Sequence, residues 1–91
     1  MARLDPALQP RFARMRGEAQ ALSRAAMAQD YDEARFRVHC IRVLAADGGC
    51  MGIWRAALEL SRYLGPLGTS PNAGYRGAFA YLANRLATGR P

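Results

Sequence analysis

His39 is the only histidine in the sequence, and its side chain is well suited to nucleophilic chemistry. A neutral imidazole is a nucleophile near physiological pH, so His39 could attack an electrophilic group. Arg42 follows three residues later, which on a helix places both side chains on one face. Its planar guanidinium could hold the oxygens of an anion beside the imidazole. We therefore take His39 and Arg42 as the candidate catalytic pair.

A metal site built on His39 is not expected. Cys40 and Cys50 are the only thiols that could join the imidazole. One histidine and two cysteines at this spacing match no zinc-binding pattern. Two cysteines also make no disulfide framework, so we expect both to be small buried apolar residues.

The elements that must position this pair are helices. Apolar residues recur at steps of three and four, and no segment shows the alternation of a strand. The pattern predicts a short N-terminal turn and then four helices, over residues 10–28, 31–47, 50–64 and 71–88. Short connections favour antiparallel neighbours. We expect an all-α fold, an antiparallel four-helix bundle with a short N-terminal helical turn, and one domain over residues 1–91.

Capping residues mark the ends of these helices. Asp30 and Glu33 have the spacing of a capping box and open the helix that carries His39. Residues 47–49 end that helix, because glycine there permits left-handed backbone. Ser70 as the N-cap and Pro71 at the first helical position are expected to open the last helix.

Helical spacing also predicts which side chains are buried. The helix of His39 has one buried stripe, formed by Ala34, Val38, Ile41 and Ala45. The next helix carries two neighbouring rows, Met51, Trp54, Leu58 and Ser61 on one face and Ile53, Ala57, Leu60 and Leu64 beside it. Three aromatic residues are at core spacing and are expected to pack rather than to stack on bases, namely Trp54, Tyr75 and Phe79.

The charge of the chain favours acidic partners. The formal net charge is +6, and all thirteen basic residues are arginines. Such a surface is attracted to acidic proteins, membranes or nucleic acid. The arginines are scattered from Arg3 to Arg90 without a basic run, so we do not expect nucleic acid to be the partner. A basic bundle that binds nucleic acid is the weakest alternative, and its affinity would fall steeply with salt.

No targeting feature stands out in the sequence. No secretory signal is recognisable, and no apolar stretch approaches the eighteen residues of a membrane span. The expected location is therefore the cytoplasm, without a membrane partner.

The segment from Asp30 to Gly49 resembles the core of histidine-phosphotransfer (HPt) domains. In that family an acidic residue opens a helix, and the phosphorylated histidine lies about nine residues later. Here Asp30 opens the helix, His39 takes the histidine position, and Arg42 takes the position of a lysine. Ile41 is the large aliphatic residue of the motif, and Gly49 is the glycine ten residues after the histidine. A register shifted by three residues loses the spacing to Asp30, so the His39 register is preferred.

The resemblance implies a phosphoryl carrier in a two-component phosphorelay. His39 would accept a phosphoryl group from a receiver-domain aspartate and pass it to another, while Arg42 stabilises it. The implied partners are a response-regulator receiver domain, a hybrid sensor kinase, or both. Magnesium is expected on the partner receiver domain, and no cofactor on this chain. Such a domain is a carrier or adaptor rather than a stand-alone enzyme.

Val43 is where the chain departs from the family. The family has glycine four residues after the histidine, which leaves the imidazole uncovered, whereas valine narrows the approach. The alternative reading is therefore a degenerate module that docks a receiver or kinase without carrying phosphate. Arg35, Val43 and Gly49 are the candidate binding residues, and Arg37 and Arg62 are further candidates for the docking face.

Overall fold

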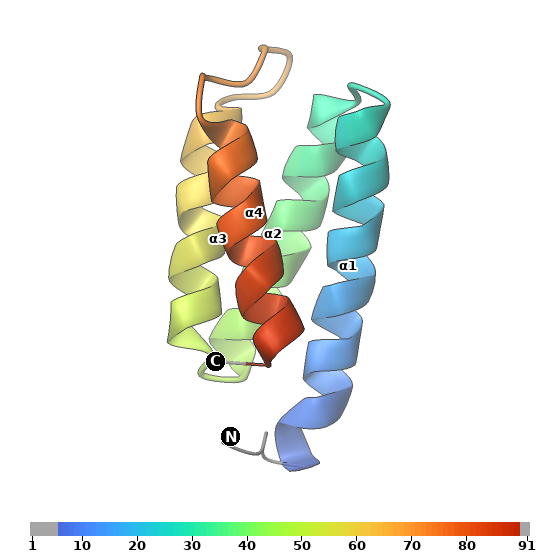
Figure 1. Ribbon diagram of the computed structural model, residues 1–91, viewed down its shortest axis with the longest axis vertical. Helices are drawn as coiled ribbons and strands as arrows, with labels where there is room; N and C mark the ends of the chain where they lie inside the picture. Colours follow the sequence, from blue (N-terminus) through green and yellow to red (C-terminus); the bar gives the residue numbers. More distant parts are fainter. Residues whose placement is uncertain (1–5, 90–91) are drawn as a thin grey trace.

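The computed structural model describes residues 6–89 and shows an all-helical bundle (Figure 1). A 3-10 turn, η1 (Pro6–Leu8), leads into α1 (Gln9–Met27) and α2 (Tyr31–Asp47). The chain continues through α3 (Met51–Leu64) to α4 (Tyr75–Thr88). Over this described range there are four α-helices and no strand, so the predicted all-α, antiparallel four-helix bundle with an N-terminal turn is confirmed.

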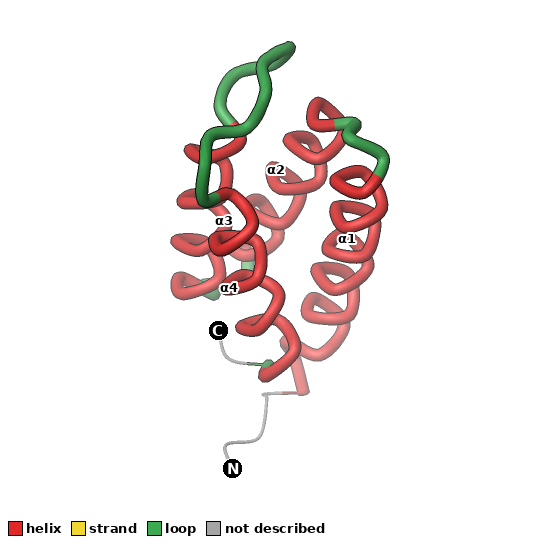
Figure 2. Tube along the Cα trace, turned by 45° about the horizontal axis from the view of Figure 1, so that its top comes forward, coloured by secondary structure: helices red, strands yellow, loops and turns green. Residues whose placement is uncertain are grey.

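The helices pack in chain order around one core. α2 lies between α1 and α3, α3 packs on α4, and α4 closes the bundle against α1 over a shorter contact. Figure 2 shows that the α3–α4 connection is much longer than the other two. Each helix contributes large, fully buried apolar side chains to the core, among them Phe12, Met15, Leu22, Val38, Ile41, Ile53, Leu60, Leu64, Leu82 and Leu86. No polar side chain is buried anywhere in residues 6–89.

The first two connections use the same tight helix ending. After α2, Gly49 has a φ of 69°, and the Cys50 N–H reaches back to the Ala45 carbonyl at 2.8 Å. After α1, Gln29 has a φ of 57°, and the Asp30 N–H donates to the Ala25 carbonyl at 2.9 Å. These are Schellman endings, which satisfy carbonyls that a helix end otherwise leaves unpaired. The glycine prediction for the end of α2 is met at Gly49.

The start of α4 differs from the sequence expectation. The helix begins at Tyr75, with Gly74 at the N-cap position, and not after Ser70 and Pro71. Residues 65–74 form a loop that α2 holds in place through long-range hydrogen bonds. The Gly68 N–H donates to the Asp32 carboxylate at 2.9 Å, and Arg35 donates to the carbonyls of Leu64, Gly65 and Thr69. Capping rules consider only residues close in sequence and take no account of these long-range contacts. The sequence therefore predicted the start of this helix too early.

The capping box at the start of α2 is only half formed. The Asp30 carboxylate accepts from the Glu33 N–H at 3.2 Å, as expected. The Glu33 carboxylate does not return to Asp30, because it accepts from Arg37 Nε at 2.8 Å. The Asp30 N–H is already bonded within the α1 Schellman ending. The start of α2 therefore has one side-chain cap, from Asp30, instead of the two of a full capping box.

The two rows of α3 are buried to different degrees. The row of Ile53, Ala57, Leu60 and Leu64 faces the core and is fully buried. In the other row Met51 is 49% exposed, and Trp54 is only partly buried against the core. Tyr75 and Phe79 of α4 are likewise partly buried and packed at the edge of the core. α3 thus turns its aliphatic row inward and leaves Trp54 at the boundary with α2.

Candidate functional site

His39 is exposed at the middle of α2. Its neighbours Val38 and Ile41 are fully buried, together with Ala34 and Ala45 of the predicted stripe. With these side chains turned into the core, position 39 faces away from it. The helix thus fixes the direction of the imidazole through packing of the residues around it.

A shallow hollow of about 200 Å³ lies beside the imidazole. His39, Arg42, Val43 and Ala46 line it from α2, and Trp54 lines it from α3. The hollow therefore joins the candidate catalytic pair to an aromatic wall on the next helix. Sequence spacing assigned Trp54 to packing, and only the α2–α3 contact brings it to the histidine.

Arg42 is the free arginine of α2. Its Nε is buried without a hydrogen-bond partner, and the described residues offer its guanidinium no carboxylate. Arg37, by contrast, pairs with Glu18 at 3.0 Å and with Glu33 at 2.8 Å, and Glu18 is the main reason that the pKa of Arg37 is raised. An unpaired guanidinium that lines the hollow of His39 is the natural place for an anion.

Arg35 lies on a part of the α2 surface that does not border the hollow. Its side chain is only 10% exposed and is directed to the end of α3 and the 65–74 loop. Arg62 of α3 pairs weakly with Glu59 at 3.4 Å, and both side chains are largely exposed. Neither arginine lines the hollow, and the contacts of Arg35 make it a brace for the loop.

Val43 and Gly49 occupy different surroundings. Val43 is 45% exposed and forms part of the wall of the hollow, next to His39 on the same helix face. Gly49 lies at the end of α2, outside the hollow, with left-handed backbone and open space where a Cβ would stand. Val43 can therefore affect access to the imidazole directly, whereas Gly49 shapes the turn that leads to α3.

Two exposed apolar side chains share the face of α2 that carries His39. Phe36 is 52% exposed, and it precedes His39 by three residues and Val43 by seven, so the three share one face of α2. The three-residue spacing between Phe36 and His39 is the sequence signal that places both on one face. Large exposed apolar groups near a polar site are typical of a docking surface.

The two cysteines have properties of inert thiols. Cys50 is fully buried, and Cys40 is partly buried. Loss of solvation is the main cause that raises the pKa of each thiol. Across residues 6–89, no three histidine, cysteine, aspartate or glutamate side chains gather as a metal ion requires.

Comparison with protein-family models, with curated proteins and with solved structures finds no match for this chain. Among the helices of the described range, none combines the length and apolar character needed to cross a membrane.

Proposed function

We propose that this chain is a histidine-containing phosphotransfer protein that carries a phosphoryl group on His39 between receiver-domain aspartates. One observation carries the proposal: an exposed imidazole shares a hollow with Arg42, the arginine of α2 that has no partner among the described residues. The resemblance of the Asp30–Gly49 segment to HPt domains supports the same chemistry. The four-helix architecture is compatible with it.

The transfer step requires little from the protein beyond position and charge. An imidazole nitrogen of His39 attacks the phosphorus of an aspartyl phosphate, a nitrogen–phosphorus bond forms, and the phosphorus–oxygen bond to the aspartate breaks. The aspartate leaves as a carboxylate, and reversal on a second receiver returns the imidazole. Arg42 offers N–H donors to the phosphoryl oxygens, which is the stabilisation that this reaction class depends on.

The surface around the hollow suits a receiver domain. Receiver active sites are acidic, whereas this chain has a net charge of +6. Long-range attraction of this kind accelerates encounter between partners. Phe36 and Val43 add exposed apolar area on the helix face of the histidine, which a docked partner would cover.

A second candidate function rests on Val43. Its side chain lines the hollow beside His39, where HPt domains leave space with glycine. In this reading the chain keeps the docking surface but excludes the partner's phosphoryl group from the imidazole. It would then act as an adaptor or inhibitor of a receiver or sensor kinase.

The test is phosphotransfer from a panel of receiver domains labelled on their aspartates. We expect acid-labile label to appear on the wild-type chain and to be absent from His39→Gln. Label of equal intensity on His39→Gln, or none on the wild type with any receiver, would falsify the carrier proposal.

Val43→Gly separates the two candidates. A docking module predicts that the wild type binds a receiver without labelling and that Val43→Gly becomes labelled. A carrier predicts robust labelling of the wild type. Arg76→Gln tests whether the loss of one positive charge outside the hollow affects labelling. Arg76 is an exposed arginine of α4, so this variant should be labelled as the wild type is.

A further inference from the structure

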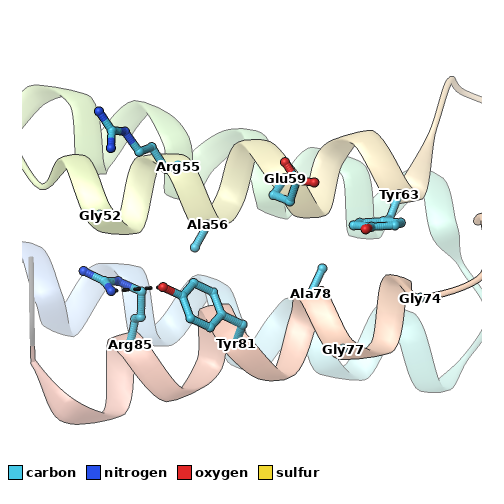
Figure 3. A pocket seen from close by; sticks show the side chains of 10 residues that line it. All are labelled: Gly52, Arg55, Ala56, Glu59, Tyr63, Gly74, Gly77, Ala78, Tyr81 and Arg85. Atoms are coloured by element: carbon cyan, nitrogen blue, oxygen red, sulfur yellow. Dashed lines mark hydrogen bonds between the residues drawn. The ribbon is translucent and has the colours of Figure 1, made fainter.

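A groove of about 600 Å³ runs between α3 and α4, and His39 is not among the residues that line it (Figure 3). Small residues of both helices line it, Gly52 and Ala56 on α3 and Gly77 and Ala78 on α4. In Figure 3, Gly52 lies at the end near Arg85, and Gly77 lies toward the end near Tyr63. The volume falls in the range of small-molecule sites. It is three times the volume of the hollow at His39.

Packing of the bundle does not require glycine at position 77. Gly77 lies inside α4, where glycine in place of alanine costs about 1 kcal/mol of helix stability. A Cβ at this position would meet nothing within 4 Å, and its backbone is ordinary helix. Packing within the chain therefore does not call for glycine here, and a larger side chain at this lining position would extend into the groove.

One end of the groove is cationic. Arg55 of α3 and Arg85 of α4 lie at the same end in Figure 3, with Tyr81 beside Arg85. Arg85 donates from Nη1 to the Tyr81 hydroxyl at 3.2 Å, but its Nε is buried and has no hydrogen-bond partner. Arg55 has no ion-pair partner within residues 6–89. Neither guanidinium is paired with a carboxylate in the part of the chain that the structure describes.

The groove changes character away from the arginines. Glu59 lines the middle of its α3 side, and at the far end the Tyr63 ring packs over Gly74. The Glu59 carboxylate repels a second negative charge, so the groove fits a molecule with one anionic end only. From Gly52 to Tyr63 the helix rises about 16 Å, which is room for an extended apolar body.

We propose that this groove binds a monoanionic amphiphile, with its carboxylate between Arg55 and Arg85 and its apolar chain along the glycine and alanine floor. The apolar body removes the small-residue floor from water, which is favourable in proportion to the area covered. A second copy of this chain is the poorer occupant. Its groove carries the same two arginines against one glutamate, so two such faces repel.

The proposal is tested by titrating the full chain with dodecanoate below its micelle concentration and recording amide NMR spectra. We expect shifts confined to the residues that line the groove. Dodecyltrimethylammonium, a cation of the same chain length, should cause none of them. Gly77→Leu should fill the groove and weaken dodecanoate binding by about tenfold or more, and Arg55→Gln combined with Arg85→Gln should do the same.

Matched variants on α1 control for the two kinds of change. Gly17 is also a helical glycine with open space at its Cβ, so Gly17→Leu changes the same residue type away from the groove. Arg16→Gln removes charge from an exposed arginine that does not line it. Both should bind dodecanoate as the wild type does, and thermal unfolding should show that all variants are folded.

Three results would overturn the proposal. The first is equal binding of the anion and the cation. The second is an undiminished set of shifts in Gly77→Leu, which would mark adventitious surfactant binding only. The third is a dimer in sedimentation that Gly77→Leu dissociates, because a second copy would then occupy the groove.

Discussion

At the residue scale, the environment of Arg42 separates it from the other arginines of α2. Arg35 and Arg37 are held by carbonyls and carboxylates, whereas Arg42 lines the hollow of His39 without a partner among the described residues. Its charge is thus available for a ligand, while theirs stabilises the bundle.

Replacing Arg42 is expected to slow phosphotransfer without unfolding the protein. Arg42→Gln should lower the rate of transfer from a labelled receiver by about ten- to a hundredfold, because a charge-assisted bond to the phosphoryl oxygens is lost. Arg42→Lys should recover most of the rate, since a point charge still reaches the anion. Single-turnover rates measured at several receiver concentrations separate transfer from docking. A loss confined to docking affinity would contradict the role given to Arg42.

Asp32 gives the protein a predictable response to acid. Its carboxylate accepts from the Gly68 N–H and from Arg35, and these contacts, the first above all, lower its pKa. A group with a lowered folded pKa stabilises the protein above its unfolded value, near pH 4, and loses that effect as pH falls through the folded pKa. Urea unfolding of wild type and Asp32→Asn should therefore differ near neutral pH and converge in stronger acid. A difference that does not shrink as the pH falls below 4 would argue against this account.

At the scale of elements, two Schellman endings of the same geometry carry different residues. Gly49 suits the left-handed position after α2, whereas Gln29 occupies the same position after α1 with a φ of 57°. Left-handed backbone costs a residue with a Cβ about 1 to 2 kcal/mol relative to glycine. The end of α1 is therefore a point of local strain, and the end of α2 is not.

Single substitutions at Gly49 and Gln29 should change the free energy of unfolding in opposite directions. Gly49→Ala should lower the free energy of unfolding by about 1 kcal/mol, and from the backbone alone, since its Cβ would contact nothing within 4 Å. Gln29→Gly should raise the free energy of unfolding by a similar amount. Urea midpoints of the two variants measure both effects. Shifts of the same sign would show that the cap geometry does not govern these positions.

At the scale of the whole molecule, Arg35 connects α2 to the far end of α3. It donates to the carbonyls of Leu64 and Gly65 at 2.6 and 2.9 Å and also to the Thr69 carbonyl. These partners include carbonyls that the end of α3 would otherwise leave unsatisfied. The long 65–74 loop is thereby fixed to the bundle rather than free to move at its end.

Removing Arg35 should loosen this loop and destabilise the bundle. Arg35→Ala is expected to lower the free energy of unfolding by about 2 to 3 kcal/mol, because charged hydrogen bonds to several carbonyls are lost at once. Hydrogen exchange should become faster at the Gly68 and Asn72 amides, which are bonded to Asp32 and to the Tyr63 carbonyl. Arg62→Ala is the control, since an exposed pair with Glu59 contributes about 0.5 kcal/mol. Equal effects of the two variants would refute the bracing role.

The sequence by itself determined that the fold is made of four helices and which stripe of α2 is buried. Periodic apolar residues such as Val38 and Ile41 must face a core, and that burial turns position 39 to the surface. The relation of His39 to Arg42 and Val43 also follows from helix geometry, because residues three and four apart share a face. These features depend on local spacing, which a sequence states completely.

Tertiary structure alone decided which arginine is free, where Trp54 lies and where α4 begins. Arg35 bonds to carbonyls 29 to 34 residues away, and Trp54 meets His39 only because α3 packs on α2. Ser70 and Pro71 have the chemistry of a helix start, but the bonds from Asp32 and Arg35 hold their segment as a loop. Such contacts arise from packing between elements, so no pattern within a single element encodes them.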